Sequence, residues 1–195
     1  MKNIAIFASG SGSDMQSVID ATLNGRIDGK VVAVVTNKEG IFAIERAKKH
    51  GIDCKTFLLG DYKDNSERDR AIVEYLRPYK IDLIVLAGYL AIVTPTLVDE
   101  YKDRIINIHP SLIPNHCGKG MYGLNVHKSV IASGDKLSGC TVHYVDYGAD
   151  TGKIIEQRQV PVKEGDTPET LQARILEVEH VLLPSVVATL CKNKQ

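Results

Sequence analysis

The sequence has no excess charge of either sign, because 24 Lys and Arg residues balance 24 Asp and Glu residues. A chain without net charge creates no long-range field that would attract nucleic acid or an anionic membrane. It also has no apolar stretch close to the ~20 residues that a membrane-spanning helix requires. We therefore expect neither a nucleic-acid partner nor a membrane partner, and any bound anion must be held by local groups.

The cysteines are few and scattered. Cys54, Cys117, Cys140 and Cys191 form no C-x-x-C pair, which argues against a zinc site and against a disulfide framework. The first residues carry only a short apolar run before Gly and Ser, so they indicate a first strand rather than a signal peptide. Reduced structural thiols and a cytoplasmic location are the expectation.

The 195 residues contain no internal repeat, low-complexity segment or linker, and 44% of them are hydrophobic. A single domain over residues 1–195 is expected. Apolar runs without polar alternation alternate with helical spacing, at residues 4–8, 31–35, 82–87 and 105–108. Strands that are apolar on both faces need helices on both sides, which predicts an α/β fold with an open, mostly parallel twisted sheet.

The C-terminal third has a different pattern. Residues 139–146 and 153–162 read as strands joined by a turn that contains Gly and Asp. A long helix follows, with Asp166 or Thr167 as its cap and Pro168 at its first position. Pro184 is expected to kink or divide this helix.

The turn after the first strand contains Gly10 and Gly12 directly before a helix. Glycines there let backbone N–H groups approach an anion at the positive end of the helix dipole. Asp14 and Met15 stand where a dinucleotide site needs its third glycine, and the Walker lysine is also missing. The turn favours a mononucleotide phosphate over NAD or ATP. The structural alternative is a tight turn capped by Ser13 or Asp14.

Asn107 and His109 lie two residues apart at the end of a buried strand, so their side chains share one face. An amide donor beside an imidazole suits a developing oxyanion, although the two could instead be a satisfied pair that ends a strand. Asp150 lies in a turn, where Asp usually serves turn chemistry. Its functional interpretation depends on the fold bringing it to His109. Thr141 and His143 share a strand face that could line the same cleft.

Six segments carry a resemblance: SGSGS at 9–13, LAGY at 86–89, NIHPSLIP at 107–114, GKGMYG at 118–123, GCTVHYV at 139–145 and DTGKII at 150–155. Together they resemble the folate-dependent formyltransferases, and among these the phosphoribosylglycinamide formyltransferases of purine synthesis. The resemblance implies transfer of a formyl group from 10-formyltetrahydrofolate to the amine of N1-(5-phospho-D-ribosyl)glycinamide, without a metal. Residues 107–114 support the reaction class, whereas length and the first loop point to the acceptor.

The resemblance also implies roles for particular residues. The catalytic residues would be Asn107, His109 and Asp150. The phosphate and ribose would contact Gly12, Ser13, Asp14 and Glu179. The folate would lie along Leu90, Ile92, Val93, Thr141 and His143. The N-terminal half would then bind the mononucleotide and the C-terminal half the folate, with residues 119–123 as a mobile flap, in a monomer or homodimer.

Three positions depart from the family pattern. Asp14 stands where the family usually has Asn, and a carboxylate at a helix start would repel phosphate unless it points away as a cap. Ala91 stands where many members carry Arg, and Asn65 lies about where another folate-side Arg occurs. The resemblance therefore implies no Arg contact to the folate tail at these two positions.

Three alternatives differ in the acceptor or in the class of function. Methionyl-tRNA formyltransferase shares the Asn-x-His segment, but it carries a further RNA-binding region and a basic surface, so this reading is weak. Formyltetrahydrofolate hydrolase would use water as the acceptor and is the runner-up. A non-catalytic mononucleotide-binding module would explain the first loop alone.

Overall fold

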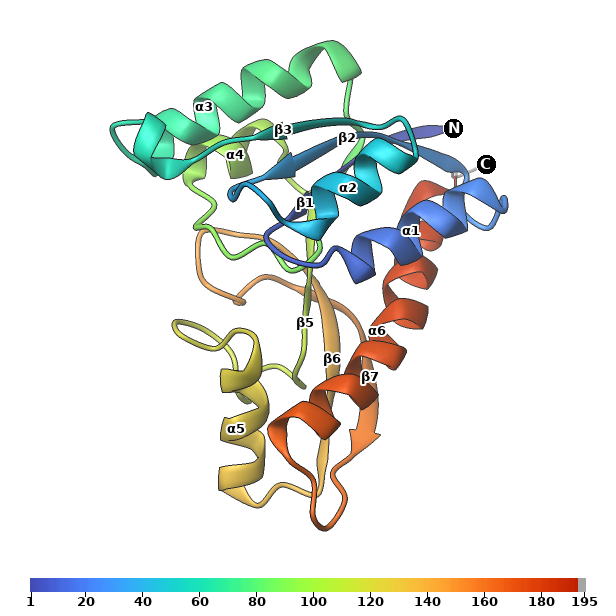
Figure 1. Cartoon of the computed structure of the whole chain (residues 1–195), viewed down its shortest axis with the longest axis vertical. Coiled ribbons are helices and arrows are strands. Elements are labelled where there is room, and N and C mark those ends of the chain that lie inside the picture. The colour runs from blue at the N-terminus through green and yellow to red at the C-terminus, as the bar shows by residue number, and fades with distance from the viewer. Residues whose placement is uncertain (193–195) are drawn as a thin grey trace.

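The computed structural model describes residues 1–192 and consists of a seven-stranded sheet in the order β3-β2-β1-β4-β5-β6-β7 (Figure 1). The first five strands are parallel: β1 (Lys2–Ala8), β2 (Gly29–Thr36), β3 (Asp53–Thr56), β4 (Leu83–Leu86) and β5 (Ile105–His109). Two antiparallel strands extend the sheet: β6 (Leu137–Tyr144) and β7 (Ile154–Pro161). The predicted open, mostly parallel α/β sheet is confirmed.

The helices in chain order are α1 (Ser13–Leu23), α2 (Phe42–Lys49), α3 (Asn65–Leu76), α4 (Pro95–Glu100), α5 (Leu124–Ser133) and α6 (Pro168–Cys191), with short 3-10 turns at Leu59–Asp61 and Arg77–Tyr79. The side chain of Asp64 caps α3 by accepting a hydrogen bond from the Glu67 amide at 2.9 Å. Helix α4 has only six residues, and no periodic pattern in the sequence announces it.

Helices cover both faces of the sheet, and successive residues of β1 are buried alternately on one face and the other. Ile4 and Ile6 are buried in a cluster with residues of α1, α2 and α6. Ala5 and Phe7 are buried in a second cluster with residues of α3 and α4. Because successive strand residues point to opposite faces, a strand buried on both sides must be apolar throughout. The uninterrupted apolar runs in the sequence follow from this arrangement.

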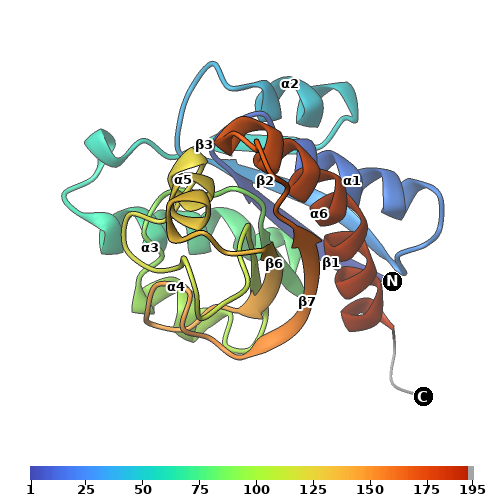
Figure 2. The ribbon, with the colours of Figure 1, turned by 90° about the horizontal axis from the view of Figure 1, so that it is seen from below.

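Helix α6 begins as expected, because Thr167 accepts a hydrogen bond from the Thr170 amide and Pro168 occupies the first turn. The expectation for Pro184 is a kink or a division of the helix, and division is wrong, since α6 continues from Pro168 to Cys191 with Pro184 buried inside it. The helix packs against α1 and the antiparallel strands, as Figures 1 and 2 show. Burial of its apolar stripe outweighs the hydrogen bond that Pro184 removes.

The strand order reverses direction at β1, which lies between β2 and β4. At the carboxyl ends of these strands the Ser9 amide donates to the Gly88 carbonyl at 3.1 Å, and the Leu90 amide donates to Ser9 Oγ at 2.8 Å. Open α/β sheets bind ligands in the crevice at such a point. The fold therefore directs attention to the segments that follow β1, β4 and β5.

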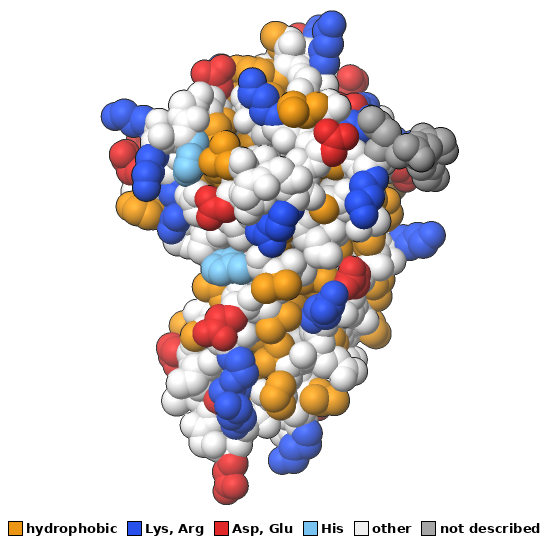
Figure 3. Space-filling view, turned by 90° about the vertical axis from the view of Figure 1, so that its right-hand side faces the viewer, with side chains coloured by type: hydrophobic (Ala, Val, Ile, Leu, Met, Phe, Trp, Pro, Cys, Tyr) orange, Lys and Arg blue, Asp and Glu red, His pale blue; other side chains and the backbone are white. Residues whose placement is uncertain are grey.

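The surface carries charges of both signs. Figure 3 shows acidic and basic side chains interspersed over the face that bears α1 and α6, without a large field of one sign. No helix within residues 1–192 is long and apolar enough to cross a bilayer. An anion-binding site must therefore be built from local groups.

Candidate active site

Strands β5 and β6 place four of the expected site residues in two cross-strand pairs. Asn107 lies opposite His143, and His109 lies opposite Thr141. Pairs on one face of an antiparallel ladder lie close enough for their side chains to touch. Asn107 Nδ2 lies 3.1 Å from His143 Nε2. His143 Nδ1 donates to the Tyr144 carbonyl at 2.7 Å, so Nε2 is the acceptor for Asn107 in the neutral ring.

Asp150 reaches the same place from the turn between β6 and β7. Its backbone is left-handed, with φ at 60°. One carboxylate oxygen, Oδ2, lies 3.5 Å from His109 Nδ1, and the other, Oδ1, accepts a hydrogen bond from Asn107 Nδ2 at 3.4 Å. The structure thus brings Asn107, His109 and Asp150 together, although they are distant in the sequence. Their catalytic roles remain predictions.

The electrostatics of this trio depend on its burial. Burial lowers the pKa of His109, and the charge of Asp150 offsets only part of that effect. Burial alone would raise the pKa of Asp150, but the neighbouring rings of His143 and His109 and the Gly118 amide lower it below the usual carboxyl value. At neutral pH the free site therefore holds a neutral imidazole beside an ionised carboxylate.

The polar atoms of Thr141 are already engaged in holding a loop. Thr141 Oγ1 donates to the Ser111 carbonyl at 2.6 Å, and Gln157 Nε2 donates to the same Oγ1 at 2.9 Å. Thr141 and His143 are both almost fully buried. Their expected contact with folate remains a prediction. The bonds of Thr141 hold the loop after β5, and His143 contacts Asn107.

The first turn ends at Gly12, whose φ is 70° and which precedes α1. The alternative in which Ser13 or Asp14 caps the helix is wrong, because no side chain caps α1. The first-turn amides of α1 have no acceptor within the helix and carry the positive end of its dipole. A hollow of about 350 Å³ adjoins them, lined by Ser13, Gln16, Ser17, Asp20, Arg26, Arg46 and His180.

The side chain of Asp14 is mostly buried and does not line this hollow. Its side chain is 13% exposed, and its Oδ1 has no hydrogen-bond partner within residues 1–192. Burial raises the pKa of Asp14 to about 7. Glu179 on α6 is buried nearby, and burial together with the charge of Asp14 raises its pKa as well. His180 Nε2 lies 3.6 Å from Asp14 Oδ1.

Substitution of Gly12 tests the geometry of this turn. A Cβ at Gly12 would lie 2.9 Å from the Cβ of Ala43, and its positive φ disfavours any side chain. Gly12→Ala should therefore lower the free energy of unfolding by about 1–3 kcal/mol in urea titration. Gly10→Ala is the control, because a Cβ there meets no atom within 4 Å. Equal stabilities of the two variants would contradict this packing argument.

Gly12→Val should weaken phosphate binding, because a side chain there blocks close approach of the backbone to the anion, but the same clash also acts on the fold. A bulkier side chain would displace α2 as well as obstruct the ligand. Weakened binding by Gly12→Val alone would not separate these effects, so the binding prediction needs the stability measurement beside it.

The segment between β4 and α4 carries the expected folate wall. Leu90 is 48% exposed and Ile92 is 68% exposed, which leaves apolar surface beside the crevice. Val93 is half-buried. Ala91 packs partly against the second core cluster, and Asn65 is the first residue of α3. Apolar walls of this kind suit a flat heterocycle.

A buried ion pair that the sequence analysis missed holds this segment. The side chains of Arg68 and Asp69 on α3 are 1% and 0% exposed, and Arg68 Nη2 lies 2.7 Å from Asp69 Oδ1. Arg68 donates to the Ile92 carbonyl at 2.5 Å, and Asp69 Oδ2 accepts hydrogen bonds from the amide and hydroxyl of Thr94 at 2.7 and 2.8 Å. The full set of partners offsets the cost of burying both charges. Adjacent Arg and Asp in a helix give no sequence signal of this role.

Two backbone groups of the loop after β5 complete the surroundings of the trio. The carbonyl of His116 accepts a hydrogen bond from His109 Nε2 at 2.9 Å. The Gly118 amide donates to Asp150 Oδ2 at 3.0 Å. Within residues 1–192, no group of three His, Cys, Asp or Glu side chains could hold a metal ion.

The fold and the site together define a class of protein. A doubly wound sheet presents an amide, an imidazole and a carboxylate at its strand ends, and the uncapped N-terminus of α1 follows a strand that ends at the same edge. The sequence profile of the family described as "Formyl transferase" matches residues 2–187. The chain belongs to this family.

Relatives and solved structures agree with this assignment. The chain is 42% identical over 193 residues to "Phosphoribosylglycinamide formyltransferase, chloroplastic" of Vigna unguiculata, covering 99% of this chain and 62% of that protein. It is 40% identical to "Phosphoribosylglycinamide formyltransferase" of Haemophilus influenzae, covering 96% and 86%. The crystal structure of phosphoribosylglycinamide formyltransferase from Bacillus halodurans superposes with a TM-score of 0.93 at 38% identity, covering 100% and 97%. The chain thus spans less than two thirds of the length of the Vigna relative.

Proposed function

We propose that this chain transfers a formyl group from 10-formyltetrahydrofolate to the amine of N1-(5-phospho-D-ribosyl)glycinamide, a step of de novo purine biosynthesis. The observation that carries the proposal is the convergence of Asn107, His109 and Asp150 at the carboxyl end of β5, the edge of the sheet at which β1 also ends before α1. The names of the relatives support the choice of acceptor.

In the proposed reaction the amine nitrogen forms a bond to the formyl carbon, and the carbonyl electron pair moves to oxygen. Asn107 Nδ2 stabilises this oxyanion, and His109 does so as well once its ring has taken up the proton that the amine releases. In the free protein both hydrogens of that amide are used, one by His143 and one by Asp150. The formyl oxygen must therefore replace one of these partners, and Asp150 forms the longer bond.

The proton released by the amine goes to the imidazole. His109 Nε2 carries a proton already, because the His116 carbonyl can only accept, so Nδ1 is the free position. Asp150 Oδ2 lies 3.5 Å from Nδ1 and can relay the proton directly or through water. Collapse of the tetrahedral intermediate breaks the bond to the folate nitrogen, which takes up the proton that His109 received from the amine. No covalent bond to the enzyme is needed.

The substrates would be held on the two sides of the trio. The first-turn amides of α1, with the Ser13 hydroxyl, would hold the phosphate, and Glu179 would hold the ribose hydroxyls. Leu90, Ile92 and Val93 would form the apolar wall for the folate, with Thr141 and His143 behind its reactive end. The N-terminal half would therefore bind the ribonucleotide and the C-terminal half the folate. A monomer or homodimer and a cytoplasmic location stay predictions.

Purified protein with a 10-formylfolate donor tests this function against its alternatives. Deformylation followed by absorbance should depend on added glycinamide ribonucleotide. Acceptor-independent release of formate would instead identify a formyltetrahydrofolate hydrolase. Tight ribonucleotide binding without any turnover would identify a binding module and end the proposal.

A further inference from the structure

The imidazole of His116 is held at both nitrogens by groups outside the trio. Nδ1 lies 2.8 Å from Ser129 Oγ on α5, and Nε2 lies 2.7 Å from Asp135 Oδ2, just after that helix. A carboxylate only accepts, so Nε2 carries the proton and Nδ1 of the neutral ring accepts from the Ser129 hydroxyl. The side chain of His116 is 15% exposed. It therefore fastens the loop after β5 to the end of α5.

Ser129, His116 and Asp135 are the residue types of a nucleophilic triad, but Ser129 is not placed as a nucleophile would be. Ser129 lies inside α5 rather than on a sharp turn. It lines neither the hollow beside α1 nor the larger one of about 460 Å³ between the end of α5 and the start of α6, although Asp135 lines the latter. Neither of these hollows offers Ser129 a substrate to attack, so the contacts point to a positioning role.

The backbone of His116 reaches the trio directly. Its φ is 52°, a left-handed conformation that costs a non-glycine residue roughly 1 kcal/mol. In this conformation its carbonyl accepts from His109 Nε2 at 2.9 Å. The carbonyl is nearer than Asp150 Oδ2, which lies 3.5 Å from Nδ1, so in the neutral ring this bond favours the tautomer with the proton on Nε2. The side-chain bonds to α5 supply the energy that holds the strained backbone in place.

The same short loop orients the carboxylate. Two residues after His116, the Gly118 amide donates to Asp150 Oδ2, the oxygen that faces His109. A shift of the loop would therefore move the acceptor for the imidazole and the donor for the carboxylate together. Misplacement of catalytic groups by about 1 Å can cost about 10²-fold in rate.

We propose that His116, fastened by Ser129 and Asp135, is a positioning residue that fixes the tautomer of His109 and the orientation of Asp150. The inference rests on the proposed function for its kinetic consequence, but its structural part concerns the free protein. The side chain of His116 would then act through His109 and Asp150 without touching the substrate or the reacting atoms.

The test compares Asp135→Ala, Asp135→Asn and Ser129→Ala in the full chain. Asp135 is 40% exposed, so these changes leave the core intact. Asp135→Ala should lower kcat about 10-fold while the KM of each substrate changes less than about twofold. Asp135→Asn keeps an acceptor and should recover most of the rate. Lys128→Ala, an exposed change on the same helix, is the control and should leave kcat unaltered.

The nitrogen chemical shifts of the His109 ring provide a readout that does not need turnover. The unaltered protein should show the Nε2–H tautomer, and Asp135→Ala and Ser129→Ala should show a mixture. That result supports the positioning role even if the unaltered protein fails to transfer formyl groups, which would refute only the proposed function. An unchanged tautomer in both variants would overturn the inference, whether or not kcat falls.

Discussion

Replacing His109 by Ala should lower kcat by about 10²-fold or more, while the affinity for the ribonucleotide stays nearly unchanged. The ring lies 3.5 Å from Asp150 and beside Asn107, where charge develops in the proposed reaction. Among the described residues, the polar contacts of the ring are to Asp150 and the His116 carbonyl, and none is to the α1 N-terminus that would hold the phosphate. The loss should therefore fall on the chemical step rather than on binding, as seen in steady-state kinetics and in a separate ribonucleotide titration.

His50→Ala is the matched control for this change. It also removes an imidazole, whose Nε2 lies 2.9 Å from Gln16 Nε2 on α1, but it leaves the trio intact. Its kcat should stay within about twofold of the unaltered protein. Near-normal turnover by His109→Ala would remove His109 from the mechanism. A weakened ribonucleotide affinity in the same variant would show that the ring acts in binding.

The sheet and the first turn could be predicted from the sequence because buried parallel strands leave a simple signal. Such strands are apolar on both faces, as in β1 and β4, and the glycines mark where the chain turns toward α1. Asn107 and His109 followed from the two-residue period of a strand. The sequence could not place Asp150, because its approach depends on a turn with a left-handed residue that many sequences could adopt.

Backbone groups of the site leave no sequence signal at all. The His116 carbonyl and the Gly118 amide contact the trio, and any residue type has these groups. The pair of Arg68 and Asp69 resembles an ordinary exposed stretch of a helix, yet both side chains are buried. Glu179 is different, because it lies four residues after Ile175 on the apolar stripe of α6. That spacing could have predicted its burial.

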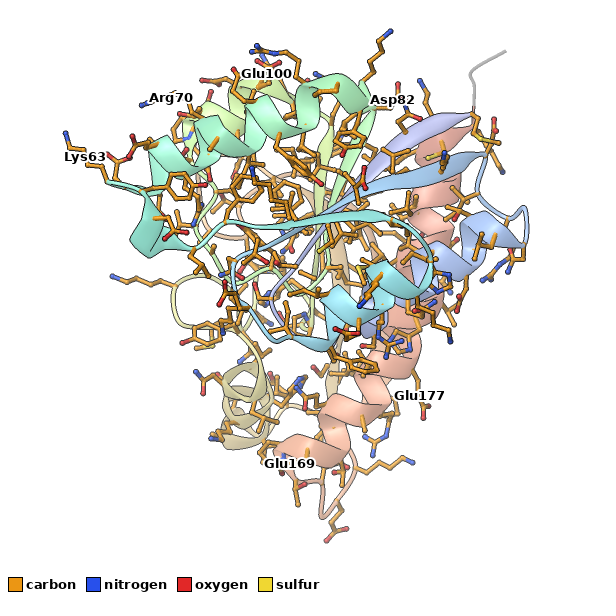
Figure 4. All side chains as sticks on the ribbon, turned by 45° about the horizontal axis from the view of Figure 1, so that its top comes forward. Lys63, Arg70, Asp82, Glu100, Glu169 and Glu177 are labelled. Carbon is orange, nitrogen blue, oxygen red and sulfur yellow. The ribbon has the colours of Figure 1, made fainter. Side chains whose placement is uncertain are left out.

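Two glutamates of α6 differ in their exposure to solvent. Figure 4 shows Glu177 on the outer side of the helix, whereas Glu179 is 6% exposed. Glu179 and Asp14 are buried at the same place with too few partners to hold two charges. The dipole of α1 would favour an ionised Asp14 by about 0.3–1 kcal/mol, which is less than the cost of burial. Burial dominates, and both carboxyls retain protons at higher pH than usual.

Replacing Asp14 by Asn should therefore stabilise the protein at pH 8 and not at pH 4. The pKa of Asp14 is about 7 in the folded protein and about 3.8 when unfolded, so the folded state binds the proton more tightly. Stability from this group is complete below pH 3.8 and is lost as the pH rises through 7. At 1.36 kcal/mol per pKa unit, the loss at pH 8 is about 4 kcal/mol.

An amide has the same shape and does not titrate, so Asp14→Asn should recover about 2–4 kcal/mol at pH 8, or roughly 5–10 °C in Tm. Thermal unfolding of both proteins from pH 4 to pH 8 measures the difference directly. Asp20→Asn is the control, because Asp20 lies on the exposed side of the same helix and should change Tm equally at both ends of this range. A gain from Asp14→Asn that is the same at pH 4 and pH 8 would show that the Asp14 carboxyl is not held protonated by its burial.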